Sequence, residues 1–159
     1  MQFENYTDRA RGLIQAAQTI ALREGHQQFT PEHILKALLD DQEGLAANLI
    51  RAAGGEPDKA LHLTEEALGK LPKVEGGNGQ IYMASPTAKV FAAAEEIGKK
   101  AGDKFVTAER LLTALAVEAS ADTARILKQS GVTANKLNEA INDIRKGRTA
   151  DTASAEQAY

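Results

Sequence analysis

The chain has 159 residues and a net charge of −3, a size that fits one domain or two closely packed halves. Aromatic residues make up only 4% of it and Trp is absent, so leucine, isoleucine and alanine must fill the core, which suits helices better than a β-sandwich. The acidic balance argues against a nucleic-acid-binding face, and the absence of cysteine excludes a disulfide framework and thiol chemistry.

In the first part of the chain, apolar residues recur with the 3.6-residue period of α-helices. The period predicts a first helix over about residues 8–24, stopped by Gly25. The tripeptide Thr-Pro-Glu at residues 30–32 is typical of a second helix start, because Thr caps free N–H groups, Pro suits the first turn and Glu faces the positive helix end. A short third helix should end near Gly54, and a fourth should begin at Pro57.

The helical period stops between residues 72 and 84, in a stretch with several glycines that we interpret as a linker between two units. The apolar tripeptide Ile-Tyr-Met at residues 81–83 predicts that part of this linker docks on the domain. Four more helices should follow over residues 85–146. From Arg148 onward no apolar period remains, so we expect a flexible tail or an interdomain linker there.

The second unit repeats the first at an offset of 77 residues. About a dozen positions between residues 13 and 59 are identical to the positions 77 residues later, without a gap. Such a tandem duplication predicts a two-fold-like scaffold and usually a binding surface. We therefore predict an all-α fold of two tandem four-helix repeats in a pseudo-two-fold arrangement.

Common catalytic motifs are absent from the sequence. A phosphate-binding loop needs G-x-x-x-x-G-K-[ST], and the glycine clusters of this chain lack the Lys and the Ser or Thr. The histidines do not follow a metal-ligand spacing, so we interpret His26, His33 and His62 as solvent-exposed or partly packed. We predict no catalytic residue, no metal site and no cofactor within these residues.

Nothing in the sequence indicates a membrane segment or a signal peptide. No apolar run approaches the roughly 20 residues of a membrane span. The N-terminus is polar and acidic rather than basic and apolar. We expect a cytoplasmic protein that binds neither nucleic acid nor membrane.

The first notable constellation is a doubled Thr-x-Glu motif, Thr30/Glu32 and Thr107/Glu109. Helix capping alone, worth roughly 1 kcal/mol for each Thr, is one interpretation. The other is that the duplication brings both helix starts and their acidic side chains to one surface as a paired polar site. The second constellation is the alanine-rich helix surface around Ala93 and Ile97, which is either ordinary core or a shallow groove for an extended segment of another polypeptide.

Several local motifs along the chain form a recognisable set. They are F-x-x-Y-T at residues 3–7, T-P-E-H-I-L-x-A-L-L at 30–39, L-P-K-V-E-G at 71–76, G-Q-I-Y-M at 79–83, G-D-K-F-V at 102–106 and I-L-K at 126–128. These motifs resemble the double Clp repeat domain at the N-terminus of Clp/AAA+ unfoldases, and the resemblance covers residues 1 to about 147. Within the family, the inter-repeat stretch favours the disaggregase branch over the protease partners ClpA and ClpC.

This resemblance implies the substrate-binding N-terminal module of an ATP-dependent protein disaggregase. Such a module captures exposed segments of aggregated or misfolded proteins for threading by a hexameric AAA+ ring. The fragment would be a monomer without enzyme activity, whereas the intact protein would be a homohexameric ATPase that uses ATP and Mg and works with the DnaK chaperone system. The alternative is the N-domain of a ClpA- or ClpC-type protease unfoldase, with an adaptor or a modified side chain as its ligand.

The resemblance also implies roles for particular residues. Three polar positions associated with substrate handling match Thr7, Asp103 and Glu109, and the family's apolar groove maps partly onto Ala93 and Ile97. Arg110 departs from the family pattern, in which an apolar residue commonly lines the groove at this position. The implied domain covers residues 3–147, with repeats at 6–71 and 85–146, a linker at 72–84, and a connection toward an ATPase module at 148–159.

Overall fold

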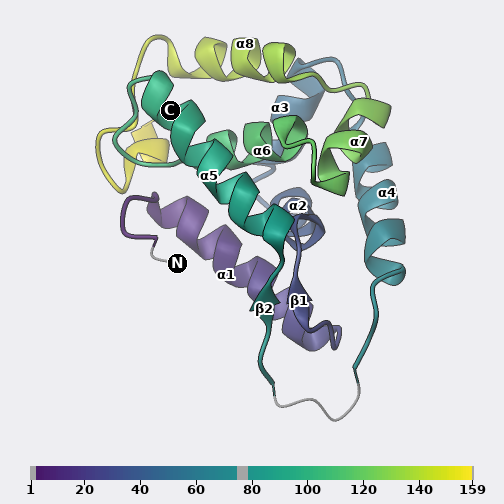
Figure 1. Cartoon of the computed structure of the whole chain (residues 1–159). Coiled ribbons are helices and arrows are strands. Elements are labelled where there is room, and N and C mark those ends of the chain that lie inside the picture. The colour runs from purple at the N-terminus through teal and green to yellow at the C-terminus, as the bar shows by residue number, and fades with distance from the viewer. Residues whose placement is uncertain (1–2, 75–78, 159) are drawn as a thin grey trace.

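A computed structural model describes residues 3–74 and 79–158 of the chain. Within these residues, eight α-helices form two groups of four (Figure 1). Each helix of the second group begins 77 residues after its counterpart in the first, so the all-α double-repeat prediction is confirmed. The helices are α1 (Asp8–Arg23), α2 (Pro31–Asp40), α3 (Leu45–Ala52) and α4 (Pro57–Gly69), then α5 (Ser85–Lys100), α6 (Ala108–Val117), α7 (Asp122–Gln129) and α8 (Ala134–Arg145).

Threonine side chains cap the starts of α1, α6 and α8. Thr7 Oγ1 accepts the backbone N–H of Ala10 at 3.2 Å, and Thr107 Oγ1 accepts that of Arg110 at 3.3 Å. At the start of α2 the backbone N–H of Thr30 donates instead to Nδ1 of His33 at 3.0 Å. These bonds satisfy backbone groups that a helix end leaves without intrahelical partners.

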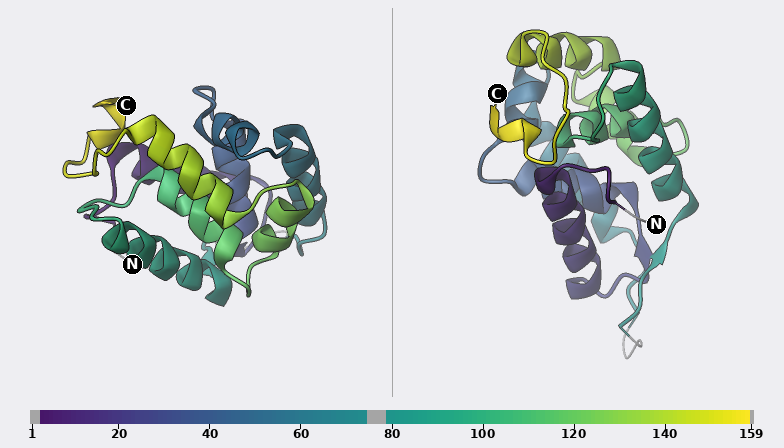
Figure 2. Two further views of the ribbon diagram at one scale, coloured as in Figure 1. Left: turned by 90° about the horizontal axis from the view of Figure 1, so that it is seen from above. Right: turned by 90° about the vertical axis from the view of Figure 1, so that its left-hand side faces the viewer.

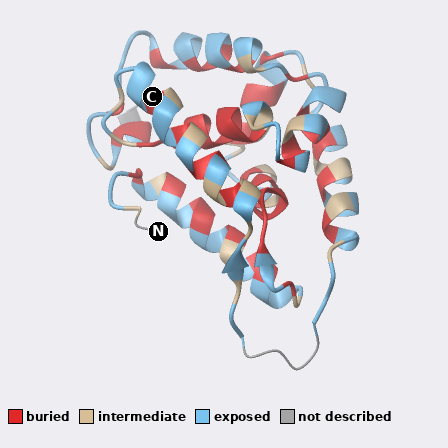
Figure 3. Cartoon of the chain, viewed as in Figure 1, coloured by how far each residue is buried: buried red, intermediate tan, exposed pale blue. Residues whose placement is uncertain are grey.

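Helices α2 and α6 lie at the centre of the molecule, and the other helices surround them (Figure 3). Helix α1 packs on α2, and α5 packs on α6. Contacts between the repeats join α2 to α6 and α7, α3 to α8, and α4 to α7. The two repeats therefore share one apolar core.

Two short strands attach the inter-repeat connection to the first repeat. Strands β1 (Gln28–Phe29) and β2 (Tyr82–Met83) pair in parallel, with Gln28 opposite Tyr82 and Phe29 opposite Met83. Ile81 packs against the core, while Tyr82 and Met83 remain exposed. The prediction that residues 81–83 dock on the domain is confirmed. Residues 75–78 of the predicted linker lie outside the described residues.

An aromatic cluster joins the two repeats. The ring of Phe91, in α5, lies 5.0 Å from that of Phe3, 6.2 Å from that of Tyr6 and 6.4 Å from that of Phe29, measured between centroids. Phe29 and Phe91 belong to different repeats, so this cluster ties α5 to the first repeat.

The C-terminal segment packs against the domain, so the prediction of a flexible tail from Arg148 is wrong for these residues. The segment returns from the end of α8 to the beginning of α1 (Figure 2) and ends in a 3-10 turn, η1 (Ala155–Ala158). Ala150, Ala155 and Glu156 are buried. The segment has no helical period because it docks through backbone bonds and small side chains.

None of the helices in the described part of the chain is long and apolar enough to cross a membrane.

Candidate functional site

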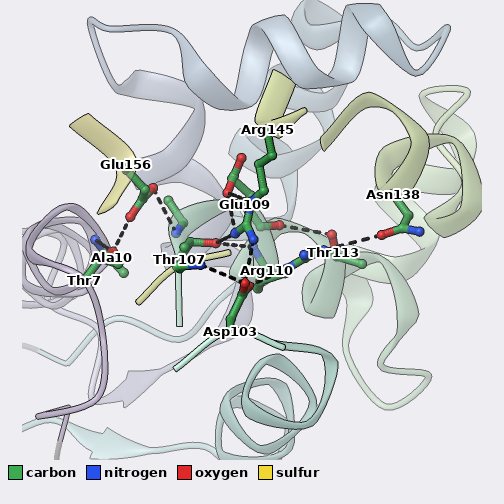
Figure 4. A network of polar contacts seen from close by, with 12 residues as sticks. Thr7, Ala10, Asp103, Thr107, Glu109, Arg110, Thr113, Asn138, Arg145 and Glu156 are labelled. Carbon is green, nitrogen blue, oxygen red and sulfur yellow. Dashed lines mark hydrogen bonds and ion pairs between the residues drawn. The ribbon is translucent and has the colours of Figure 1, made fainter. Parts of the chain in front are cut away.

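A buried network of ion pairs lies between the last turn of α8 and the start of α6 (Figure 4). Arg145 Nη1 donates to Asp103 Oδ1 at 2.6 Å. Its Nε and Nη2 donate to Glu109 Oε1 at 3.0 and 2.7 Å, and Nη2 also donates to Thr107 Oγ1 at 3.1 Å. Only 2% of the Arg145 side chain is exposed, and its guanidinium is shared between two buried carboxylates.

Asp103 holds a second guanidinium as well. Arg110 Nε donates to Asp103 Oδ2 at 3.1 Å, and Arg110 Nη1 donates to Asn138 Oδ1 at 3.4 Å. The Arg110 side chain is buried. At the position where the resemblance implies a groove-lining apolar residue, this chain therefore has an internal ion pair.

Glu156 extends the network to the start of α1. Thr7 Oγ1 donates to Glu156 Oε1, and the backbone N–H of Ala108 donates to Glu156 Oε2 at 3.3 Å. Both α1 and α6 begin at this carboxylate, and helix N-termini favour negative charge. Glu156 thus connects the first residues of α1 and α6 through its two oxygens.

The charges of the network follow from burial and from its hydrogen bonds. Burial opposes ionisation of Asp103, but bonds from Arg145, from the backbone of Ala150 and from Arg110 hold its pKa below the usual range. Burial likewise opposes the charge of Arg145, yet Asp103 and Glu109 raise the pKa of this guanidinium. Burial, with a smaller contribution from the charge of Glu109, raises the pKa of Glu156 to about 7.

The structure brings Thr7, Asp103, Glu109 and Thr107 together in this one network (Figure 4). Their side chains face inward: Thr7 and Glu109 are each 1% exposed, and the Asp103 side chain is fully buried. Direct contact of these side chains with a client would require the surrounding structure to open.

Ala93 and Ile97 lie on α5, outside the ionic network. Both are half-buried and pack against the core, next to the exposed Ala92 and Glu96. The side chains of Ala93 and Ile97 therefore belong partly to the core and partly to the surface. The core-packing interpretation describes their inward side, and a shallow binding surface on their outward side stays a prediction.

The first-repeat motif does not join this network. Thr30 and Glu32 are buried at the start of α2, and no hydrogen bond connects them to Thr107 or Glu109 among the described residues. Burial, followed by the charge of Asp122, raises the pKa of Glu32. The helix-capping interpretation therefore describes the first motif better than a paired surface site.

The interpretation of His26 and His33 as exposed or partly packed is wrong. His26 is 4% exposed and His33 is fully buried, with 2.9 Å between His26 Nδ1 and His33 Nε2. At the 77-residue offset, His26 corresponds to Asp103 and His33 to Arg110. A neutral histidine pair thus occupies in the first repeat the positions of an ion pair in the second. His62, in contrast, is exposed.

The hydrogen bonds assign the protons of this pair. The N–H of Thr30 donates to Nδ1 of His33, so the proton of neutral His33 lies on Nε2 and is donated to Nδ1 of His26. His26 then carries its proton on Nε2, which is buried and has no acceptor among the described residues. An added proton on either ring would break one of these two bonds.

We expect the histidine pair to make the domain less stable as the pH falls. Burial, together with the neighbouring His26, lowers the pKa of His33 to about 4, and burial lowers that of His26. At these two rings the unfolded chain therefore binds more protons than the folded chain between pH 6.5 and 4, and their contribution to the free energy of unfolding falls across this interval, by about 2.5 kcal/mol for His33. The raised pKa values of Glu156 and Glu32 act in the opposite direction over the same interval, so the contribution of the histidines is the difference between the parent chain and a variant without the titrating ring. Urea unfolding at several pH values measures this change.

The matched variant for this measurement is His33→Gln, because a glutamine can keep the bond to the N–H of Thr30 but cannot titrate. As the pH falls from 6.5 to 4, the free energy of unfolding of this variant should fall less, or rise more, than that of the parent chain. The control, His62→Gln, should behave as the parent does. Equal slopes for His33→Gln and the parent would show that the pair does not control acid stability.

A hollow of about 1060 Å³ lies along α1. Leu13, Ala16 and Ile20 of α1 line one side of it, and Ala153 and Gln157 of the C-terminal segment line another. Among residues 3–74 and 79–158, no group of three or more His, Cys, Asp or Glu side chains is arranged to hold a metal ion.

Two central residues of the network, Arg145 and Glu156, were not predicted. A signal for Arg145 exists in the sequence, because it lies eight residues after Leu137 on the apolar face of α8 and corresponds to Leu68 at the 77-residue offset. A charged residue at such a position is expected to have a buried partner. No comparable signal marks Glu156, which follows a stretch without periodicity.

In the part of the chain that the structure describes, eight helices in two equivalent groups around a shared core define a double-repeat helical domain. The chain belongs to the Clp repeat (R) N-terminal domain family, which matches residues 5–130. It is 63% identical to the chaperone protein ClpB of Rhizobium meliloti (strain 1021) and 38% identical to that of Rickettsia felis, over its whole length in both comparisons. The chain spans 18% of the length of each relative.

Solved structures confirm the fold. The N-terminal domain of Hsp104 from Candida albicans superposes with a TM-score of 0.82, at 22% identity, over 96% of this chain and 99% of that chain. The N-terminal domain of the ClpV1 ATPase from E. coli superposes with a TM-score of 0.74, at 18% identity, over 91% of this chain and 88% of the other. The ClpB relatives favour the disaggregase branch over ClpA and ClpC.

Proposed function

We propose that this domain is the substrate-binding N-terminal module of a ClpB-type disaggregase and captures exposed segments of aggregated or misfolded proteins. The observation that carries this proposal is the similarity to ClpB, which extends over the whole chain and is restricted to 18% of the relative. A separate module of this kind can bind weakly and still act efficiently, because a tether keeps it at high effective concentration near the rest of the protein.

In this proposal, clients contact the half-buried side chains of Ala93 and Ile97 on α5. Ile97 offers aliphatic surface, and the small side chain of Ala93, one turn earlier on the same face, leaves room for a polypeptide backbone. The buried Arg110 adds no apolar surface, so the contact area should be smaller than in a chain with an apolar residue there. Thr7, Asp103 and Glu109 would affect clients through the structure they support, since their side chains face inward.

The properties of the intact protein belong to the same proposal. It would be a cytoplasmic homohexamer that hydrolyses ATP with Mg in its AAA+ modules and cooperates with the DnaK system. Residues 3–147 would form the Clp repeat domain, and residues 148–159 would lead toward the first ATPase module. The fragment would bind clients as a monomer without ATPase activity.

The substitution Ile97→Asp is expected to weaken binding of an unfolded protein about tenfold, which corresponds to about 1.4 kcal/mol. A charge at this position removes aliphatic contact area and would have to lose water when a client binds. Titrating a fluorescently labelled, permanently unfolded protein with the isolated domain measures the dissociation constant.

The matched control is Leu22→Asp, which places the same charge at an exposed leucine of α1. It should bind as tightly as the parent chain, and circular dichroism should show that both variants are folded. Equal affinity of Ile97→Asp and Leu22→Asp would contradict a client-binding surface on α5.

A further inference from the structure

The C-terminal segment, residues 149–157, crosses the starts of α1 and α6 and is called the strap below. The backbone N–H of Ala150 donates to Asp103 Oδ1 at 3.0 Å. The carbonyl oxygen of Ala150 accepts the backbone N–H groups of Lys104 and Phe105 at 2.9 and 3.0 Å. A fully buried residue of the strap thus has both of its backbone groups bonded to the loop before α6.

Two further contacts join the strap to α1. The backbone N–H of Asp8 donates to the carbonyl oxygen of Ala153 at 2.8 Å. The Glu156 carboxylate accepts the Thr7 hydroxyl and, on its other oxygen, the N–H of Ala108 (Figure 4). The strap therefore bonds to the first residues of α1 and α6 through Glu156, and to Asp103 through Ala150.

The buried apolar area of the strap is small. Of its apolar side chains, Ala150 and Ala155 are buried and Ala153 is half-buried, and an alanine side chain contributes little hydrophobic stabilisation. Polar contacts must therefore supply much of the docking energy. The ion pairs join the carboxylates of Asp103 and Glu109 to the guanidinium groups of Arg110 and Arg145, whereas Glu156 makes no ion pair among the described residues and accepts bonds from Thr7 and from the N–H of Ala108.

Glu109 and Glu156 are the less well compensated carboxylates of this site. Glu109 accepts both of its bonds from Arg145 on Oε1, while Oε2 is buried and accepts no hydrogen bond from the described residues. Burial and, to a smaller extent, the charge of Glu109 disfavour the ionised form of Glu156 in the docked strap, whereas the bonds from Thr7 and from the N–H of Ala108 favour docking. Release of the strap would return the Glu156 carboxylate to water and break these two bonds.

We propose that Thr7, Asp103, Glu109 and Arg145 form a docking site for the strap, from which the strap is released as a unit while the helical core stays folded. Docking fixes the point from which the chain leaves the domain. The docked strap also forms one wall of the hollow along α1, through Ala153 and Gln157, so release of the strap opens this hollow. Thr7, Asp103 and Glu109, which the resemblance associates with substrate handling, would then act by holding the strap rather than by contacting a client.

The absence of cysteine allows a direct test with single thiol reporters. Ala155→Cys places a reporter in the strap, and Ala94→Cys places one at a fully buried position of α5. The rate of labelling with a maleimide is measured for each reporter in the 159-residue chain, in urea-unfolded chain, and in Asp103→Ala and Glu156→Ala backgrounds. Glu139→Ala, an exposed carboxylate of α8, is the matched control background.

In the otherwise unchanged chain, the strap reporter should be labelled at least tenfold more slowly than in urea. In the Asp103→Ala and Glu156→Ala backgrounds its rate should rise at least tenfold, with no rise in Glu139→Ala, while the core reporter stays protected throughout.

Two results would overturn the proposal. In the first, the strap reporter has the same rate in all backgrounds, so the network does not hold the strap. In the second, both reporters gain reactivity together, so the strap opens only with the core. Client binding through α5 does not enter either readout, so the proposed function is tested separately.

Discussion

Replacing Arg145 by alanine is expected to lower the free energy of unfolding by about 3–5 kcal/mol, because it leaves two buried carboxylates without their shared counter-charge. Asp103 would keep its bond to Arg110, whereas Glu109 would lose both of its charged hydrogen bonds. Natural domains are typically stable by about 5–15 kcal/mol, so this loss would be a large part of the total. Urea unfolding followed by circular dichroism measures it.

The control for this prediction is Arg125→Ala on the exposed surface of α7, where one long hydrogen bond to Gln129 at 3.4 Å is lost. Its cost should be within about 0.5 kcal/mol of zero. Arg145→Lys should give an intermediate loss, since an ammonium keeps the charge but cannot reproduce the planar fork. If Arg145→Ala lowered the free energy of unfolding by less than about 1 kcal/mol, the network would not contribute strongly to stability. Such a result is expected if water enters and solvates the carboxylates.

Local signals account for the parts of the fold that the sequence predicts. The helix starts depend on residues that act within one turn, such as Thr107 and the backbone N–H it accepts three residues later. The helix stops depend on glycine, as at Gly25 and Gly102, whose φ angles of +73° and +86° favour a residue without a side chain. Because both repeats carry these signals, the 77-residue offset predicts the helix boundaries of one repeat from those of the other.

The candidate site depends on contacts between distant segments, and these have no local signature. His26 and His33 were expected near the surface because histidine is often half-exposed, but α1, α2 and the inter-repeat connection bury them together. The C-terminal strap was expected to be flexible because it has no apolar period. Its docking uses the backbone of Ala150 and one carboxylate, Glu156, and neither contributes to hydrophobic periodicity.

The two repeats have the same arrangement of helices but different polar side chains at equivalent buried positions. In the first repeat, a pair of neutral histidines and Leu68 occupy the positions that Asp103, Arg110 and Arg145 occupy in the second. Among the described residues, only the second repeat therefore has a buried charge network, and the strap docks on it. The duplication explains the scaffold, and the residues that differ between the repeats explain why the strap docks on the second repeat and α1.

The last prediction concerns the core that the repeats share. Phe91→Ala is expected to lower the free energy of unfolding by about 3–5 kcal/mol, the usual cost of removing a fully buried aromatic ring. The ring contacts Phe3 and Tyr6 at the N-terminus and Phe29 in the first repeat, so its loss leaves a cavity between the repeats. Thermal and urea unfolding, each followed by both circular dichroism and tyrosine fluorescence, measure the loss.

The comparison variant is Phe105→Ala, a half-buried phenylalanine outside this cluster, which should cost less than half as much because less of its ring leaves water on folding. If the repeats share one core, Phe91→Ala should unfold in a single transition at which both probes coincide, since removing the ring weakens both halves together. Two separate transitions would instead mean that each repeat folds independently, and the position of α5, with its proposed client-binding surface, would then depend on the second repeat alone.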